Sequence, residues 1–277
     1  MRVGVVVPTL AEPTRLDLLT EALASIRSQG GVDLSVVLVT PESRVGPLSA
    51  LLPDLTVIQQ QGKGIADAIM CGWAALPADV DYLAWLGDDD RLTHGALAAA
   101  AAALESAPKA GMAFGRCLYI GIAGEPVCET RPGRVALTLL ALGTNLIAQP
   151  GSLYRRSAVD AIGGLDSDLA LAFDVDLHLR LSRTTPAVYL ARVLGEARVH
   201  PGSLTTSERG RSEAEAEWVM SRALGPVLAA TRRFWRPPVR LAGRVVSKAG
   251  TRTSTPRLVD ERATDGRTVR QPGAPAR

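Results

Sequence analysis

The N-terminal part of the chain alternates short apolar runs with segments of helical periodicity, and this alternation constrains the fold most. Strands separated by helices predict parallel β-α-β units, and therefore a Rossmann-type α/β sheet with helices on both faces. Ligands of such sheets bind beyond the carboxyl ends of the strands. The clearest helical spacing covers residues 16–26. The runs that have the length of buried strands are residues 2–7, 34–39, 55–58 and 82–86.

The pattern changes after about residue 110. Residues 112–122 and 127–130 predict a hairpin around Gly124, and a helix is expected at about residues 174–182. These elements predict a mixed region built onto the first sheet, closer to a lid than to an independent domain. The expected division is 1–110 and 111–206 as the halves of one domain, 207–236 as a C-terminal helix, and 237–277 as a basic, mostly disordered tail.

Composition excludes several classes of protein. Apolar residues make up 47% of the 277 residues, which is enough for a core, and aromatic residues only 4%, so aliphatic side chains must fill it. The longest apolar run, residues 96–104, is far shorter than the roughly 20 residues of a membrane-spanning helix. The N-terminal apolar stretch is also too short for a secretory signal. Three cysteines, an odd number, make a disulfide framework improbable, and we expect a cytoplasmic protein.

Positive charge is concentrated at the C-terminus. Residues 231–277 contain twelve Lys and Arg against three Asp and Glu, a net charge of +9. The overall charge is +3, so residues 1–230 carry −6, which argues against a body that binds nucleic acid. Apolar side chains interspersed with arginines in residues 232–248 indicate a segment that docks on an anionic membrane surface, at the inner face of the plasma membrane. The alternative is a solvated tail that only aids solubility.

Three consecutive carboxylates, Asp88, Asp89 and Asp90, directly follow the fourth apolar run. Adjacent carboxylates repel one another unless a cation lies among them. Their hard oxygen ligands suit Mg²⁺ or Mn²⁺, especially where a diphosphate completes the coordination. The alternative is an acidic loop that precedes the next helix.

Three further segments contain candidate site residues. Lys63 and Gly64 open a helix in which Asp67 could reach a nucleotide, or could simply favour the helix dipole. Asp174 and Asp176 lie at the start of another expected helix, where one could cap the helix and one could act as a general base. A histidine before Pro-Gly, His200, is more often a turn residue than a ligand.

Together these segments resemble glycosyltransferase family 2, the inverting enzymes of GT-A fold, including those of bacterial exopolysaccharide assembly. The resemblance covers about residues 2–206, and it depends more on the order and spacing of the motifs than on any one of them. The matching segments are Val5-Val6-Val7-Pro8-Thr9, Lys63-Gly64-Ile65-Ala66-Asp67-Ala68, Leu86-Gly87-Asp88-Asp89-Asp90, Gln149 with Tyr154-Arg155-Arg156, residues 173–180, and His200-Pro201-Gly202-Ser203.

The resemblance implies a reaction and a set of roles. A sugar would move from a nucleoside-diphosphate sugar to a hydroxyl of a glycan or lipid-linked acceptor in bacterial surface polysaccharide synthesis. Asp174 would be the general base, while Asp176 would serve structure. The metal, Mg²⁺ or Mn²⁺, would be bound by Asp89, with Asp90 and His200 as further ligands. The residues expected to bind the donor nucleotide are Pro8, Thr9, Glu12, Thr40, Lys63, Asp67 and Asp88.

The chain departs from the family pattern at the end of the second strand. The family usually has an aspartate that contacts the nucleobase, but this position is Thr40, with Glu42 as a possible substitute. This difference motivates an alternative, a catalytically inactive glycosyltransferase-like protein that binds a nucleotide or a partner. A sugar nucleotidyltransferase is a third reading. Those enzymes usually have a glycine-rich, basic loop after the first strand, whereas residues 9–13 contain neither glycine nor lysine.

Overall fold

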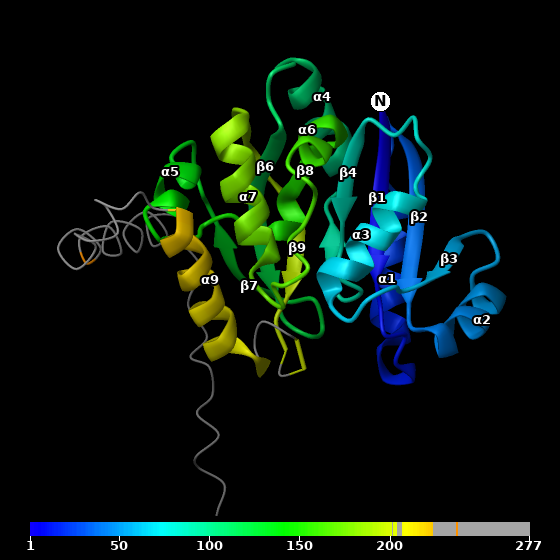
Figure 1. Cartoon of the computed structure of the whole chain (residues 1–277). Helices are drawn as coiled ribbons and strands as arrows, with labels where there is room; N and C mark the ends of the chain where they lie inside the picture. The colour runs from blue at the N-terminus through cyan, green and yellow to red at the C-terminus, as the bar shows by residue number, and fades with distance from the viewer. Residues whose placement is uncertain (201, 204–206, 224–236, 238–277) are drawn as a thin grey trace, which may run out of the picture.

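The computed structural model describes residues 1–200, 202–203, 207–223 and 237, and its strands form one nine-stranded sheet (Figure 1). The first four strands pair in parallel in the order β3-β2-β1-β4, which confirms the expected β-α-β arrangement. The strands are β1 (Arg2–Pro8), β2 (Asp33–Thr40), β3 (Thr56–Gln59) and β4 (Tyr82–Trp85). The helical segments that connect and follow them are η1 (Pro13–Arg15), α1 (Leu16–Arg27), α2 (Glu42–Leu51), α3 (Ile65–Ala75) and α4 (Ala96–Glu105).

The second half of the chain extends the same sheet with mixed strand directions. β8 pairs antiparallel with both β4 and β6, β6 pairs parallel with β9, and β5 pairs antiparallel with β9. The expected hairpin is confirmed, because β7 pairs antiparallel with β6. The strands are β5 (Arg91–Leu92), β6 (Met112–Ile120), β7 (Pro126–Thr130), β8 (Ser152–Arg155) and β9 (Ala187–Arg198).

Helices of the second half lie mainly on one face of this extension (Figure 1). The helix expected at residues 174–182 is α7, one residue longer at its start and two longer at its end. The expected C-terminal helix is observed as α9, and residues 224–236 lie outside the described part of the chain. The helical segments are α5 (Ala136–Ala141), η2 (Gln149–Gly151), α6 (Arg156–Ala161), α7 (Phe173–Thr184) and α9 (Arg209–Ala223).

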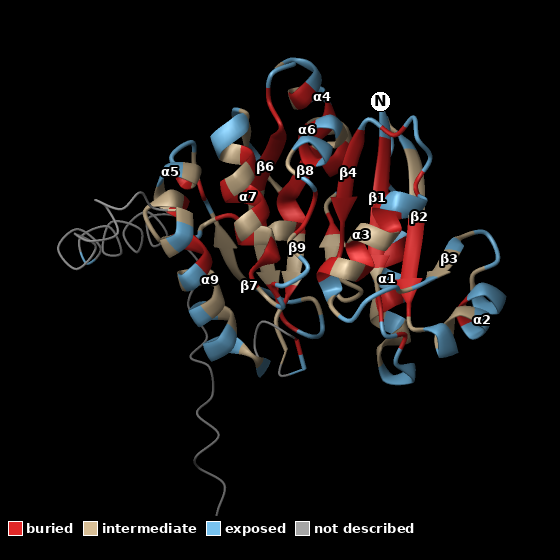
Figure 2. Cartoon of the chain, viewed as in Figure 1, coloured by how far each residue is buried: buried red, intermediate tan, exposed pale blue. Residues whose placement is uncertain are grey.

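Two hydrophobic clusters hold the layers together, one on each face of the sheet (Figure 2). Successive side chains of a strand point to opposite faces, so Val5 and Val7 pack with α1 and α4, whereas Val6 packs with α3. Gly72 allows α3 to approach the sheet, because a Cβ there would lie 2.4 Å from Val6 Cγ1. This packing fixes the strand ends at which the candidate site lies.

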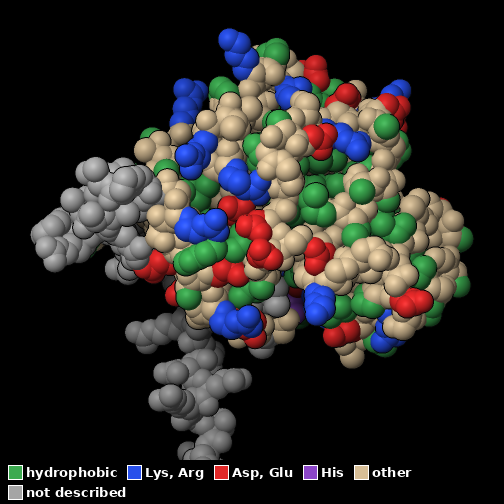
Figure 3. Space-filling model, in the orientation of Figure 1, with side chains coloured by type: hydrophobic (Ala, Val, Ile, Leu, Met, Phe, Trp, Pro, Cys, Tyr) green, Lys and Arg blue, Asp and Glu red, His purple; other side chains and the backbone are tan. Residues whose placement is uncertain are grey.

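Three features bear on membrane contact and charge: the length of the helices, the basic tail and the surface of the body. Among the residues described, no helix is long and apolar enough to cross a membrane. Apart from Pro237, the expected tail, residues 237–277, and the expected membrane-docking segment, residues 232–248, lie outside the described residues. On the face of the body in Figure 3, Lys and Arg side chains lie among Asp and Glu side chains, and neither sign dominates.

Candidate active site

The carboxyl ends of β1, β2 and β4 meet at one edge of the sheet. Pro8 ends β1, and the amide of the next residue, Thr9, donates a hydrogen bond to Val39 O of β2 at 2.9 Å. The Thr9 hydroxyl donates to Asp88 Oδ2, beyond the end of β4, at 2.7 Å. The parallel topology therefore brings Pro8, Thr9 and the acidic segment together, at the edge where α/β sheets bind their ligands.

Asp88 and Asp89 converge on a single cationic nitrogen. Arg15 Nη2 lies 2.9 Å from both Asp88 Oδ1 and Asp89 Oδ2. His200 Nε2 lies 2.9 Å from the same Asp89 oxygen, so the structure brings His200 to the acidic segment as expected. Burial raises the pKa of Asp88, while the Thr9 hydroxyl and the Arg15 guanidinium oppose that shift.

Asp90 has a different environment from its two neighbours. Its Oδ1 accepts a hydrogen bond from the Arg198 backbone amide at 2.8 Å, which ties the acidic segment to the end of β9. Burial, and then the charge of Asp89, raise the pKa of Asp90 to about 8. Gly87 leaves room for the carboxylates, because a Cβ there would lie 2.9 Å from Asp90 Oδ2.

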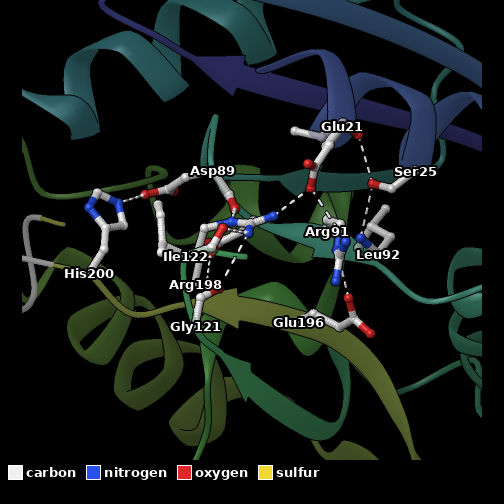
Figure 4. Close-up of polar contacts among 12 residues, drawn as sticks. Glu21, Ser25, Asp89, Arg91, Leu92, Gly121, Ile122, Glu196, Arg198 and His200 are labelled. Carbon is white, nitrogen blue, oxygen red and sulfur yellow. Dashed lines mark hydrogen bonds and ion pairs between the residues drawn. The ribbon is translucent and has the colours of Figure 1, made fainter. Parts of the chain in front are cut away.

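Arg198, the last residue of β9, holds the acidic segment in place (Figure 4). No motif in the sequence singles this arginine out. Its side chain is 1% exposed and reaches three separate elements. It donates to Asp89 O at 2.9 Å, to Gly121 O at 3.3 Å and to Ile122 O at 2.5 Å, and it pairs with Glu21 Oε2 at 2.6 Å. A buried guanidinium is stable only when it is paired and hydrogen-bonded in this way.

Asp174 is the second residue of α7, and its environment suits a base. Burial raises the pKa of Asp174 to about 6, although the side chain keeps some contact with solvent. The preceding residue, Phe173, packs against Trp85 of β4 with ring centroids 6.1 Å apart. Burial mainly raises the pKa of Tyr119, and the charges of Asp90 and Asp174 both add to it. The contact between Phe173 and Trp85 therefore places the start of α7 beside the end of β4, which the acidic segment follows.

Glu215 of α9 holds the segment that leads into α7, the helix that carries Asp174. Its carboxylate accepts hydrogen bonds from the backbone amides of Ala170, Leu171 and Ala172 at 3.0, 2.6 and 2.7 Å. Such amides at a helix start have no intrahelical partner, and a negative charge there favours the helix dipole. The sequence expected α9 only as a C-terminal helix, but its Glu215 supports the candidate base.

Asp176 has a structural role. Its Oδ2 pairs with Arg180 Nε at 2.6 Å, one helical turn away. The same guanidinium donates to Ile162 O at 2.9 Å and to Gly164 O at 2.7 Å. These contacts attach α7 to the loop after α6, in agreement with the structural role expected for Asp176.

Asp67 caps the start of α3 rather than standing free. Its Oδ2 accepts hydrogen bonds from the amides of Lys63 and Gly64 at 2.8 and 3.2 Å. A hydrogen bond from Ser167, followed by those two amides, holds the pKa of Asp67 below its usual range. The Lys63 side chain is exposed. These contacts tie Asp67 to the start of its own helix, where the alternative reading placed it as an acid that favours the helix dipole, and they leave the Lys63 side chain exposed.

Thr40 ends β2 as a buried residue with an orphaned hydroxyl. It is 0% exposed, and its Oγ1 has no hydrogen-bond partner within the described part of the chain. Buried polar groups are usually satisfied, so the lone hydroxyl makes the end of β2 unusual, although it is closed to solvent in this structure. Glu42, the possible substitute, is the exposed first residue of α2, and Glu12 is exposed at the start of η1.

The acidic segment suits a divalent cation, although no preformed cage is present. Among the residues that the structure describes, no group of three or more His, Cys, Asp or Glu side chains is arranged to hold a metal ion. Two carboxylate oxygens, of Asp88 and Asp89, nevertheless converge on one cationic atom. Such an incomplete oxygen donor set is typical of Mg²⁺ sites that substrate phosphates complete.

An α/β sheet of this order, with carboxylates at its switch between parallel and mixed strands, is the GT-A fold of glycosyltransferases. The sequence pattern of the family "Glycosyl transferase family 2" matches residues 4–163, more than half of the chain. The chain therefore belongs to glycosyl transferase family 2, as its motifs indicated. A comparison with curated proteins gave no match.

Solved structures of glycosyltransferases share the fold at low sequence identity. TarS of S. aureus, residues 1–349, has 16% identity and a TM-score of 0.60, and the alignment covers 87% of this chain and 72% of that one. TarS in complex with UDP-GlcNAc has 17% identity and a TM-score of 0.57, covering 85% and 73% of the two chains. The mannosyltransferase PcManGT of Pyrobaculum calidifontis, with GDP-Man and Mn²⁺, has 18% identity and a TM-score of 0.56, covering 90% and 75%.

Proposed function

We propose that this glycosyltransferase moves a sugar from a nucleoside-diphosphate sugar to a hydroxyl of a glycan or lipid-linked acceptor, with inversion at the anomeric carbon. The observation that carries the proposal is the convergence of Asp88 and Asp89 on one cation, beyond the strand end against which Phe173, the neighbour of the candidate base Asp174, packs. Structural relatives support the donor class, because TarS binds UDP-GlcNAc and PcManGT binds GDP-Man with Mn²⁺. The proposed catalytic unit is residues 1–206, with α9 as its support.

The chain's own residues account for donor binding. Asp88 and Asp89, with His200 beside them, would hold Mg²⁺ or Mn²⁺, which when bound offsets the charge of the leaving diphosphate. In this proposal Asp88 takes the place that the family resemblance gave to Asp90, because Asp90 Oδ1 accepts the amide of Arg198. The exposed side chain of Lys63 is proposed to contact the nucleotide, and the Thr40 hydroxyl would do so only if donor binding opens the end of β2. Thr9 holds Asp88 in position through its hydroxyl.

The displacement needs one base and no covalent enzyme intermediate. Asp174 takes the proton of the acceptor hydroxyl while that oxygen forms a bond to the anomeric carbon. The bond from the anomeric carbon to the diphosphate oxygen breaks, and the electron pair leaves with the nucleoside diphosphate. Attack from the face opposite the leaving group inverts the configuration, through an oxocarbenium-like transition state such as that of glycoside hydrolysis.

A panel of nucleotide sugars tests the proposal. We expect at least one UDP-, GDP-, ADP- or dTDP-sugar to release nucleoside diphosphate slowly into water, and faster with Mn²⁺ than with a chelator. Binding of a nucleotide without any such release would support the inactive, nucleotide-binding alternative. Release of inorganic diphosphate from a nucleoside triphosphate and a sugar phosphate would instead identify a nucleotidyltransferase.

We further propose a role in bacterial surface polysaccharide synthesis, with the basic tail docking on the anionic inner face of the plasma membrane. The support is the charge asymmetry of the sequence, +9 in residues 231–277 against −6 in the rest. Each basic residue near an anionic surface contributes on the order of 1 kcal/mol. Full-length protein should therefore sediment with anionic vesicles at low salt, and a chain ending at Thr231 should not. Equal sedimentation of both forms, or of neither, contradicts the docking role.

A further inference from the structure

Arg15 occupies the point on which the two candidate metal ligands converge. It is the last residue of η1, directly before α1, and its side chain is 25% exposed. Its Nη2 contacts Asp88 Oδ1 and Asp89 Oδ2 at the same distance, 2.9 Å. Its Nε is buried and has no hydrogen-bond partner among the residues described. The two carboxylates are therefore the polar contacts that hold this guanidinium.

A divalent cation and the guanidinium compete for the same two charges. An ion bound by these oxygens lies about 2.1 Å from each, so it would be no more than about 5 Å from Arg15 Nη2. Two cations at that separation, in a site that is mostly closed to solvent, repel each other. Binding of the metal is therefore favoured when Arg15 leaves at least one of the carboxylates.

The other cationic side chains described next to the acidic segment have partners of their own, and Arg91, which follows Asp90, pairs with Glu196 at 2.8 Å and with Glu21 at 3.4 Å. The Arg198 guanidinium is committed to Glu21 and to three backbone carbonyls, those of Asp89, Gly121 and Ile122. The imidazole of His200 contacts Asp89 at 2.9 Å. When Arg15 is absent, the charges of Asp88 and Asp89 are left without the cation that bridges them.

We propose that Arg15 is a built-in counter-ion that Mg²⁺ or Mn²⁺ must displace from Asp88 and Asp89. The inference deepens the proposed function, on which it rests for the identity of the metal site. In the donor-free enzyme, Arg15 lowers the affinity for divalent cations. Once displaced, its forked guanidinium is complementary to the diphosphate of the donor. Arg15 is therefore a positioning residue that couples binding of the metal to binding of the donor.

The test is binding of Mn²⁺ to the full-length protein without any nucleotide, followed by the electron paramagnetic resonance signal of free Mn²⁺. We expect Arg15→Gln to tighten the dissociation constant at least about tenfold, because it removes a competing positive charge. The dissociation constant of Arg15→Lys, which keeps the charge but not the forked guanidinium, should lie between those of the wild type and Arg15→Gln. Arg27→Gln is the matched control, because Arg27 on α1 pairs with the exposed Asp54, and it should leave the constant unchanged.

The tighter binding of Mn²⁺ by Arg15→Gln must depend on Asp88 and Asp89. The double variant Arg15→Gln/Asp89→Asn should lose the gain, whereas a gain that persists in it would place the Mn²⁺ elsewhere and overturn the inference. Equal or weaker Mn²⁺ binding by both Arg15 variants than by the wild type would also overturn it. If the gain is observed but no nucleotide sugar is turned over, the proposed function fails and the inference stands. If a nucleotide sugar is turned over but Arg15→Gln does not bind Mn²⁺ more tightly, the proposed function stands and the inference fails.

Discussion

Replacing Asp174 by asparagine is expected to lower the rate of sugar transfer at least about 100-fold while leaving nucleotide binding intact. An amide cannot take the proton of the acceptor hydroxyl, but it keeps the size and much of the hydrogen bonding of the carboxylate. The start of α7 should keep its shape, because Glu215 holds the amides of Ala170, Leu171 and Ala172 independently of Asp174. Steady-state transfer and nucleotide binding, measured on the same preparation, separate the two effects.

The raised pKa of Asp174 gives this prediction a second readout. Because the base must be deprotonated, wild-type transfer should fall as the pH drops below about 6, the pKa to which burial raises this group. Residual transfer by Asp174→Asn should lack that dependence. A carboxyl whose pKa is raised on folding binds more protons when folded. The contribution of Asp174 to stability therefore decreases as the pH rises from 3.8, the ordinary pKa of the group, through about 6, its pKa in the folded protein. The variant should therefore unfold at an equal or higher temperature than the wild type at pH 8.

Asp176→Asn is the matched control, two residues along the same helix. It removes the charge that pairs with Arg180 and so loosens the attachment of α7 to the loop after α6. We expect a lower melting temperature, with a transfer rate that stays within a few-fold of the wild type. If Asp176→Asn abolishes transfer and Asp174→Asn does not, the roles of the two aspartates are reversed.

The sheet and the location of the acidic segment could be predicted because their signals are local. A run such as residues 82–86 is short, apolar and bounded by polar residues, so it predicts a buried strand wherever it occurs. Parallel pairing then places whatever follows each strand at a common edge, as the contact between Thr9 and Asp88 shows. By contrast, α2 was not expected, because it contains Pro47 and buries only Leu48.

The groups that hold the site in place could not be predicted, because their partners are distant in sequence. Arg15 meets Asp88 across 73 positions, and Arg198 meets Glu21 across 177. Glu215 reaches α7 from a helix beyond the region that the family pattern matches. Arginine and glutamate are ordinary on a helix or strand surface, so nothing in their immediate neighbours distinguishes them. Only the folded sheet brings Arg15 and Arg198 to the acidic segment, and Glu215 to the start of α7.

Asp89→Asn is expected to lower sugar transfer at least about 100-fold even at saturating Mn²⁺. Asp89 is the carboxylate that both Arg15 and His200 contact through Oδ2, so it lies where a cation is bound most directly. An amide oxygen carries no full charge, and transition-state stabilisation by a bound metal depends on that metal being held firmly at the leaving group. The measurement is the transfer rate with the best nucleotide sugar as Mn²⁺ is raised.

The pKa of Asp90 shows whether Asp89→Asn acts locally. The charge of Asp89 is one cause of the raised pKa of Asp90, after burial, so removing that charge should relieve part of the shift without unfolding the segment. Asp54→Asn, which removes an exposed partner of Arg27, is the control and should transfer sugar at the wild-type rate. If Asp89→Asn stays within about threefold of the wild type, which is less than roughly 0.7 kcal/mol of barrier, Asp89 is not the direct ligand. The same substitution at Asp88 would then identify the alternative register, because Asp88 is the other carboxylate that reaches the cation position.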